Sequence, residues 1–115
     1  MKLKATESEL IRAIYEYLKY KGHLVVRVYA GGLRKDDGSY RPQPYLQKGT
    51  SDLLVCVKPS GRFLSLEVKS KDGQVSEHQD AFLESVIRAG GEGAVVRSIN
   101  DVECVIEKIQ GGIYD

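Results

Sequence analysis

An apolar stretch at residues 62–70 ends in charged residues, and this combination constrains the fold more than any other part of the chain. Its sequence, Arg-Phe-Leu-Ser-Leu-Glu-Val-Lys-Ser, is typical of a β-strand and lies between two turn-forming segments. Side chains two apart in a strand point to the same side, so Glu67 and Lys69 share one face. A carboxylate and an amine at the end of a buried strand cost free energy unless they are paired or used.

A second strand brings another carboxylate to the same place. Residues 53–57 are apolar, follow Asp52, and are joined to the 62–70 strand by a short turn. The two strands therefore form an antiparallel hairpin, which places the start of the first beside the end of the second. We expect Asp52 to lie next to Glu67 and Lys69. The alternative role for Asp52 is a common one, closing the turn before a strand.

The first helix is predicted from Thr6 to about residue 21. Thr6 and Glu9 form a capping box, and Gly22 ends the helix. At about 100° per residue, Glu7 falls in the middle of the apolar face and Glu9 falls nearly opposite. Glu7 is thus an acid aimed at the interior, although a solvated first-turn acid favoured by the helix dipole is the alternative.

A second helix is predicted at residues 76–89, capped by Ser76 and ended by a Gly-Gly pair. Gln79 lies on its apolar stripe, where a buried amide needs partners. His78 lies off the stripe, and we interpret it as a surface residue with a weak prospect of substrate contact.

The remaining elements are a strand at residues 24–29, a strand at 92–98, and a last helix capped by Asn100. The predicted order is helix, three strands, helix, strand, helix. This order indicates an α/β domain whose mixed sheet is flanked by helices.

Residues 30–48 form a long connection that carries basic and aromatic side chains. Its Asp-Gly pair at 37–38 could turn a small hairpin. The connection is interpreted as an arm over a polyanion, with an ordinary solvated loop as an equally weighted alternative. The predicted nucleic-acid contacts, here and after the 62–70 strand, are Arg34, Lys35, Arg41, Lys48 and Lys71.

The composition of the chain narrows the classes of protein to which it could belong. The 115 residues suit one domain, 1–115, and no apolar run is long enough to span a membrane. No signal peptide is visible, and Cys56 and Cys104 do not form a zinc or disulfide pattern, so a cytoplasmic location is expected. A net charge of +1 gives no overall basic signature for nucleic acid, but local patches matter more than totals.

Carboxylates that converge repel one another unless a cation lies between them. Mg²⁺ and Mn²⁺ favour such oxygen ligands, and a nearby lysine could orient or deprotonate an attacking water. These are the parts that metal-assisted hydrolysis of a phosphodiester requires.

Asp52, fourteen intervening residues and then Glu67-Val68-Lys69 resemble the PD-(D/E)xK nuclease motif. Together with the helix acid Glu7 and the later Gln79, the layout over roughly residues 6–98 is similar to the VRR-NUC (virus-type replication-repair nuclease) family. The resemblance implies a restriction-endonuclease-like core of order αβββαβ with an extra C-terminal helix.

The resemblance also implies roles for these residues. Lys69 would act on the attacking water, and Gln79 would support the site or the scissile phosphate. Glu7 would bind the metal directly or through water. The implied ligands of Mg²⁺ or Mn²⁺ are Asp52, Glu67, the carbonyl of Val68, and Glu7.

Two positions depart from the family pattern. Ser51 precedes Asp52 where the family usually has proline, and we expect altered rigidity rather than lost activity. Ile11 stands where glutamine is often found, so one supporting contact to the site would be missing.

The family implies DNA cleavage, and a chain of only this domain resembles the stand-alone phage and bacterial members. We therefore predict a metal-dependent, structure-selective endonuclease for branched or duplex DNA, resolving Holliday junctions in DNA repair as a homodimer. Its setting would be a bacterial, prophage-bearing or phage-infected cell. The alternatives are a general or sequence-specific restriction-like endonuclease, a non-catalytic DNA-binding subunit, and a metal-free interaction domain.

Overall fold

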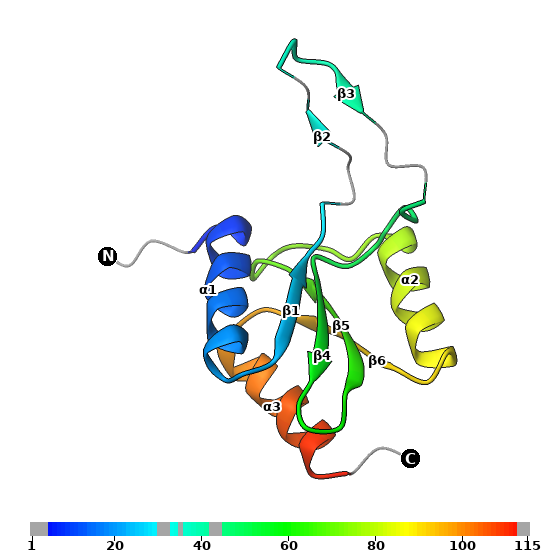
Figure 1. Cartoon of the computed structure of the whole chain (residues 1–115). Coiled ribbons are helices and arrows are strands. Elements are labelled where there is room, and N and C mark those ends of the chain that lie inside the picture. Colours follow the sequence, from blue (N-terminus) through cyan, green and yellow to red (C-terminus); the bar gives the residue numbers. More distant parts are fainter. Residues whose placement is uncertain (1–4, 30–32, 35, 42–44, 113–115) are drawn as a thin grey trace.

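A four-stranded sheet forms the centre of the molecule, with helices on both of its faces (Figure 1). The computed structural model describes residues 5–29, 33–34, 36–41 and 45–112. The helices in this part of the chain are α1 (Glu7–Tyr20), α2 (Glu77–Arg88) and α3 (Ile99–Gln110). The strands are β1 (Leu24–Arg27), β2 (Leu33–Arg34), β3 (Tyr40–Arg41), β4 (Leu53–Val57), β5 (Arg62–Val68) and β6 (Glu92–Val96).

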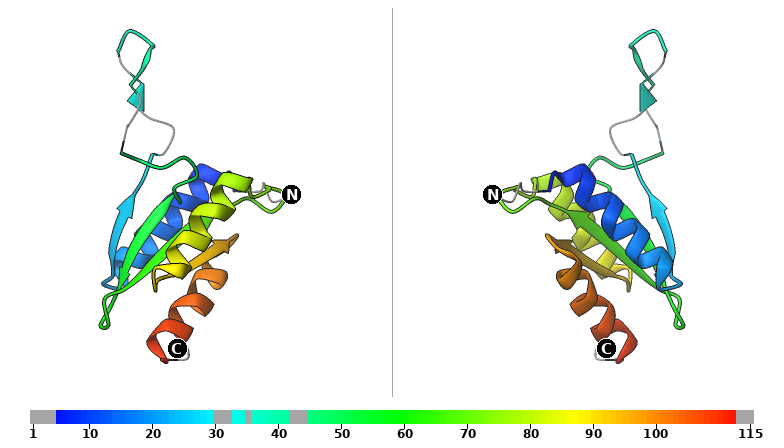
Figure 2. Two further views of the ribbon diagram at one scale, coloured as in Figure 1. Left: turned by 90° about the vertical axis from the view of Figure 1, so that its right-hand side faces the viewer. Right: turned by 90° about the vertical axis from the view of Figure 1, so that its left-hand side faces the viewer.

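The strand order β1-β4-β5-β6 makes the sheet mixed, as the sequence predicted. β1, β4 and β5 are antiparallel neighbours, whereas β6 runs parallel to β5 after the α2 crossover. Helices α1 and α3 pack together against one face, and α2 packs against β5 and β6 on the other (Figure 2). The fold class inferred from the sequence is therefore confirmed.

The hydrophobic core lies between the sheet and the α1–α3 pair. Alternation along the strands sends every second side chain of β4 and β5 into it. Its buried members include Ile14, Leu18, Leu53, Val55, Leu64, Leu66, Val68, Val96, Val102 and Ile106.

The helix caps explain where the helices begin. Thr6 accepts a hydrogen bond from the N–H of Glu9, and the Glu9 carboxylate accepts one from the N–H of Thr6, so the predicted capping box is confirmed. The cap predicted for α3 was wrong. Ser98, not Asn100, is the N-cap, because its hydroxyl accepts from the N–H of Asp101.

The predicted strands 24–29 and 92–98 are shorter in the structure. β1 ends at Arg27, and β6 ends at Val96, where the chain turns toward the Ser98 cap. Both strands stop where their ladder partners stop, since Arg27 pairs with Leu53 and Val96 pairs with Val68.

Strands β2 and β3 form a separate two-stranded hairpin that projects away from the main sheet (Figure 1). Gly38 takes a positive φ in the turn, and the Asp37 carboxylate accepts hydrogen bonds from the N–H and hydroxyl of Ser39. The Asp-Gly turn predicted from the sequence is confirmed. In the part of the chain described, no helix is long and apolar enough to cross a membrane.

Candidate active site

The hairpin of β4 and β5 places Asp52 beside the end of β5. Leu53 pairs with Leu66, so Asp52 stands one residue further along, opposite Glu67. The Oδ2 atom of Asp52 accepts a hydrogen bond from the N–H of Val68 at 2.8 Å. The side chain thus bridges the two strands at the point where their ladder ends, as the antiparallel pairing predicted.

Glu67 is the buried acid at the centre of this cluster, with only 2% of its surface exposed. Its Oε1 atom accepts a hydrogen bond from Nε2 of Gln79 at 2.8 Å and lies 3.8 Å from Nζ of Lys69. Its Oε2 atom accepts no hydrogen bond from any residue that the structure describes. A buried carboxylate oxygen without a donor is costly, which marks this atom as available to a ligand.

The pKa of Glu67 is raised by its burial and by the neighbouring carboxylates. Burial raises the pKa of Glu67 to about 8, because the charged form loses its hydration. The nearby carboxylate of Asp52 raises this pKa further, and Glu7 adds to the effect, while the Lys69 ammonium opposes it. Burial and the two neighbouring carboxylates together outweigh the lysine that opposes them.

Gln79 reaches Glu67 because of how α2 begins. Its Oε1 atom accepts from the N–H of Ser76 in the capping box, which leaves its amide nitrogen free to donate to Glu67. A glutamine can serve both partners at once because its side chain carries an acceptor and a donor. The expectation that a core-facing glutamine needs partners is met by these two contacts.

The loop before Asp52 packs directly under the start of α2. A Cβ atom added at Gly49 would lie 2.2 Å from the carbonyl oxygen of His78, and the φ angle of Gly49 is +87°. Only glycine fits this approach without strain. The side chain of His78 itself is exposed, as the sequence suggested.

Glu7 and Glu9 separate as the helical spacing predicted. Glu9 is exposed and serves the cap, whereas Glu7 is half-buried and its Oε2 atom accepts from the N–H of Ser70 at 3.4 Å. Glu7 thereby connects α1 to the backbone just after Lys69.

Arg27 is a site residue that the sequence analysis did not identify. Its Nη1 atom donates to the carbonyl oxygens of Val28 and Asp52, and lies 3.8 Å from Oδ1 of Asp52. Its guanidinium also lies over the ring of Tyr29, 4.4 Å from the ring centre. The signal that could have identified Arg27 from the sequence is a charged residue within the otherwise apolar stretch 24–29.

Ser51 and Ile11, the two departures from the family pattern, both have structural roles. Ser51 is fully buried, and its hydroxyl oxygen accepts a hydrogen bond from the Ser65 hydroxyl at 2.6 Å. This bond ties the residue before Asp52 to β5 where the family usually has proline. Ile11 is a buried core residue, so packing replaces the polar contact that a glutamine would make.

The predicted nucleic-acid contacts are only partly described. Lys48 and Lys71 are exposed. Arg34 and Arg41 belong to β2 and β3, but their side chains lie outside the described structure, as does the whole of Lys35. The Arg97 guanidinium, which the sequence analysis did not identify, donates to the carbonyls of Ser70, Lys71 and Gly73 and so shapes the turn after Lys69.

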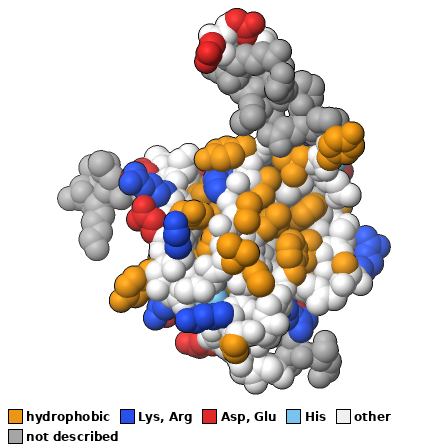
Figure 3. All heavy atoms as spheres, viewed as in Figure 1, with side chains coloured by type: hydrophobic (Ala, Val, Ile, Leu, Met, Phe, Trp, Pro, Cys, Tyr) orange, Lys and Arg blue, Asp and Glu red, His pale blue; other side chains and the backbone are white. Residues whose placement is uncertain are grey.

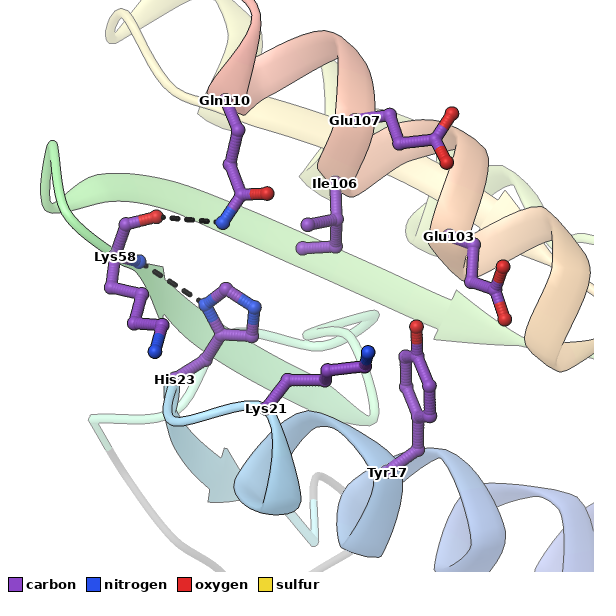
Figure 4. Close-up of a pocket in the computed structure, with 8 residues that line it drawn as sticks. All are labelled: Tyr17, Lys21, His23, Lys58, Glu103, Ile106, Glu107 and Gln110. Atoms are coloured by element: carbon purple, nitrogen blue, oxygen red, sulfur yellow. Dashed lines mark hydrogen bonds between the residues drawn. The ribbon is translucent and has the colours of Figure 1, made fainter.

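A groove of about 410 Å³ lies at the opposite end of the strands (Figure 4). Here Nδ1 of His23 accepts from the N–H of Lys58, and Gln110 donates to the Lys58 carbonyl. Burial lowers the pKa of His23, and the charge of Lys58 lowers it further. The groove is lined by both lysines and glutamates, and it is remote from Asp52 and Glu67, so it is not part of the carboxylate site.

The donor atoms of the carboxylate site determine which cation it could hold. The described residues hold no group of three or more His, Cys, Asp or Glu arranged to bind a metal. Asp52 and Glu67 nevertheless supply hard oxygen donors, and the Oε2 atom of Glu67 is buried without a hydrogen-bond partner among the described residues. This donor set suits Mg²⁺ or Mn²⁺ rather than a thiolate-seeking metal.

A mixed sheet with an Asp from one hairpin strand and a Glu-x-Lys at the end of the next defines a PD-(D/E)xK-type nuclease domain. A comparison with protein families matches residues 42–100, which make up half of the chain, to the VRR-NUC domain. The chain belongs to the VRR-NUC family. Its function is therefore of the nuclease type and concerns DNA processing, as the resemblance implied.

Solved structures agree with this assignment. One described as "VRR_NUC domain" is 26% identical, with a TM-score of 0.60, covering 90% of this chain and 97% of that one. Another, described as "VRR_NUC domain protein", is 17% identical, with a TM-score of 0.60, covering 94% of this chain and 88% of that one. At this identity the likeness shows only that the two chains have the same fold. A search of curated proteins found no match.

Proposed function

We propose that this chain is a structure-selective DNA endonuclease that depends on Mg²⁺ or Mn²⁺ and resolves Holliday junctions as a homodimer. The observation that carries the proposal is the buried Glu67 carboxylate, which has an unpartnered oxygen and lies beside Asp52 and Lys69. A site built only for stability would have paired that oxygen.

The residues proposed to hold the cation come from α1, the β4–β5 hairpin and the end of β5. Asp52 and Glu67 would bind directly, with the Val68 carbonyl completing the set. Glu7 would contribute through water, since its carboxylate is engaged with the Ser70 N–H. When bound, such a cation supplies Lewis acidity toward the scissile phosphate and its attacking water.

Lys69 is proposed to act on the attacking water. Its side chain is largely buried, at 11% exposure, and its ammonium group is held 3.8 Å from Oε1 of Glu67. An ammonium group fixed in this way can orient the water or stabilise negative charge on the phosphate. Gln79 keeps Glu67 in place through its amide and so maintains the spacing between acid and lysine.

Arg27 is proposed to position Asp52. Its contacts to the Asp52 carbonyl and carboxylate fix the residue from the β1 side, while the Val68 N–H fixes it from the β5 side. Asp52 is thus held at both its backbone and its side chain before any ligand arrives, which favours a preorganised site.

DNA would be held mainly through its phosphates. The net charge of +1 gives no long-range basic field, so binding would rest on local contacts such as Lys48 and Lys71 and would weaken with salt. The projecting β2–β3 hairpin is proposed to reach over the DNA or a second subunit (Figure 1). The enzyme would work in DNA repair in the cytoplasm of a bacterial, prophage-bearing or phage-infected cell.

The two alternatives are a non-catalytic DNA-binding subunit and a restriction-like endonuclease. A non-catalytic DNA-binding subunit would not need Lys69 buried against Glu67, and the complete Asp, Glu and Lys set argues against it. A general or sequence-specific restriction-like endonuclease uses the same site and differs only in substrate choice.

The test is cleavage of labelled four-way junction, flap, nicked and plain duplex DNA with Mg²⁺, with Mn²⁺ and with chelator. Wild type is compared with Asp52→Ala. Cutting that requires both metal and Asp52, and that is fastest on the four-way junction, supports the proposal. Equal cutting of plain duplex would indicate a general endonuclease, and binding without cutting would indicate a DNA-binding subunit.

A further inference from the structure

A pocket of about 480 Å³ lies between α1 and the end of β1. Pockets of this size hold small ligands or parts of larger ones. The roles proposed above use the Arg27 side chain but assign nothing to the pocket itself. Its lining comes from α1, from β1 and from the residues just after β1, and consists of Ser8, Ile11, Arg12, Tyr15, Arg27 and Tyr29. We call it the α1–β1 pocket.

Two walls of the α1–β1 pocket continue into the carboxylate site. Arg27 lines the pocket and also donates to the Asp52 carbonyl, with its Nη1 atom 3.8 Å from Oδ1 of Asp52. Ser8 lines the pocket from α1 and directly follows Glu7, whose charge acts on Glu67. The pocket and the proposed metal site therefore share a border, so a DNA strand bound at one would extend to the other.

The pocket offers an exposed aromatic ring with a cation behind it. Tyr29 is 58% exposed, and the Arg27 guanidinium lies 4.4 Å from the centre of its ring. A guanidinium covers only one face of a ring, so the exposed part of Tyr29 is available to a second flat group. Ile11 adds an apolar wall. A flat aromatic ligand gains from stacking in such a place.

The same pocket carries positive charge for an anion attached to that ligand. Arg12 is 82% exposed and pairs with Glu16 at 3.3 Å. An exposed ion pair is weak, so Arg12 can exchange Glu16 for a phosphate, which a guanidinium binds through two parallel hydrogen bonds. Lys19 lies over the Tyr15 ring, 5.8 Å from its centre, and brings a further cation to this side of α1. None of the six described lining residues is acidic.

We propose that the α1–β1 pocket takes one unpaired nucleotide of the strand that is cut, with its base on Tyr29 and its phosphate at Arg12. The proposal rests on the nuclease function proposed above and adds the feature of DNA that the enzyme would recognise. A base inside a duplex has both faces covered by its neighbours, so only a base that has left the stack can meet Tyr29. Leaving the stack costs least where the base is already unpaired, as at a branch point.

The distribution of side chains over the surface supports a local contact of this kind. Figure 3 shows a face on which hydrophobic side chains gather at the centre, with Lys and Arg side chains mostly around them. A surface that is apolar at its centre contributes little to the binding of phosphates, so DNA would be held where cations lie beside aromatic rings. The α1–β1 pocket combines the two next to the proposed metal site.

A stacked nucleotide gives the enzyme a way to select DNA by structure. Every base has an aromatic face, so stacking on Tyr29 is tolerant of sequence. Binding instead depends on whether a nucleotide beside the cut is free to leave the helix. Because Arg27 contacts both the Tyr29 ring and Asp52, the captured nucleotide would lie directly next to the residues proposed to bind the cation.

The first test measures binding by fluorescence anisotropy in chelator, so that metal-dependent cutting does not interfere. Two labelled flap DNAs are identical except that the unpaired nucleotide at the branch carries thymine in one and is abasic in the other. Wild type is expected to bind the thymine flap roughly ten- to a hundredfold more tightly, the range for stacking one base on an aromatic side chain. Tyr29→Ala should bind both flaps alike, and Tyr29→Phe should keep the preference because it keeps the ring.

Tyr20→Ala is the matched control for the loss of a tyrosine. Tyr20 is 86% exposed and lies on α1, but it does not line the pocket. This variant should prefer the thymine flap as wild type does. Thermal unfolding of each variant checks that the fold is retained, which is expected because both rings are largely exposed.

The second test locates the phosphate through the salt dependence of binding to the thymine flap. Removing one phosphate contact should reduce the slope of log affinity against log salt by roughly 0.7–0.9. Arg12→Ala is expected to show this change. Arg88→Ala is the control, since Arg88 is an exposed arginine at the end of α2 that does not line the pocket. An unchanged slope in Arg12→Ala would overturn the placement of the phosphate.

These outcomes separate the pocket from the nuclease activity. A thymine preference that Tyr29→Ala removes supports the pocket even if wild type cuts no DNA with Mg²⁺, in which case only the proposed function fails. Equal binding of the two flaps by wild type overturns the pocket, even for an enzyme that cuts. So does a preference that Tyr29→Ala leaves intact.

A photochemical measurement on wild type covers the case in which Tyr29→Ala fails to fold. The thymine at the branch is replaced by 5-iodouracil, which forms a covalent bond on irradiation with an aromatic side chain in contact with it. Peptide mass spectrometry then locates the attachment. A cross-link at Tyr29 supports the proposal, and cross-links confined to other parts of the chain overturn it.

Discussion

Gln79 and Glu67 connect the start of a helix to the end of a strand. Nε2 of Gln79 donates to Oε1 of Glu67 at 2.8 Å while Oε1 of Gln79 accepts from the N–H of Ser76. The same side chain therefore caps α2 and holds the buried acid. The cap fixes the side chain, and the fixed side chain fixes the carboxylate, so helix formation and site geometry are coupled.

Replacing Gln79 with Glu should separate these two roles. Glutamate keeps the acceptor that caps Ser76 but places a second carboxylate against Glu67 in place of a donor. We expect α2 to form and cleavage to fall by roughly tenfold or more. Circular dichroism checks the helix and a cleavage assay checks activity. Full activity in Gln79→Glu would show that the amide contact does not serve the site.

Lys69→Ala should abolish cleavage while leaving the fold and DNA binding largely intact. The loss is expected to be roughly 10²–10³-fold, the range for removing a group that stabilises charge developing in the transition state. Thermal unfolding, a binding assay and single-turnover cleavage are measured together. Lys108→Ala is the control, since Lys108 is an exposed lysine on α3 that has no proposed contact with DNA. Loss of folding in Lys69→Ala would instead make Lys69 a structural partner of Glu67.

Glu7→Gln should reduce activity much more than Glu9→Gln. Glu7 faces the site and contacts the Ser70 N–H, whereas Glu9 caps α1 and is exposed. Glutamine preserves both hydrogen bonds and removes only the charge, so the comparison isolates negative charge at the site. Cleavage rates are compared as a function of Mg²⁺ concentration, with the larger shift expected in Glu7→Gln. Equal effects would contradict the assignment of Glu7 to the site.

Without metal, Glu67 should make stability fall as pH rises. Its pKa is raised from an ordinary value of 4.5 to about 8, so the folded state binds more protons than the unfolded state between these values. The stabilisation is complete below pH 4.5 and is lost as pH rises through 8. The slope is at most about 1.4 kcal/mol per pH unit.

Denaturant unfolding in chelator across this range measures the slope. His23, whose pKa is lowered, acts in the opposite direction below pH 6.5, so wild type must be compared with Glu67→Gln at each pH. The difference between them should grow with pH and shrink when Mg²⁺ is added. A difference that is constant with pH would contradict the raised pKa.

Gly49→Ala should destabilise the fold and disturb the site together. The new methyl group would meet the His78 carbonyl at 2.2 Å, and the φ of +87° adds strain of about 1–3 kcal/mol. The start of α2 must shift, and Gln79 shifts with it. Unfolding midpoints and cleavage rates report the two effects. Gly38→Ala is the control, because Gly38 has a similar φ but open space around its Cβ position.

Much of the site could be predicted from the sequence because it depends on short-range geometry. Strand alternation, a short turn and antiparallel pairing were enough to place Asp52 opposite Glu67. Helical periodicity and the capping box distinguished Glu7 from Glu9. The sequence misplaced the cap of α3, because Ser98 and Asn100 are both good capping residues and the end of β6 decides between them.

Tertiary structure alone decided how these pieces meet. The contact of Arg27 with Asp52 spans 25 residues, the contact of Glu7 with Ser70 spans 63, and the approach of Gly49 to His78 joins a loop to a separate helix. Local periodicity fixes the direction of a side chain within its own element. The packing of elements that are distant in sequence decides whether that side chain contacts another residue or solvent.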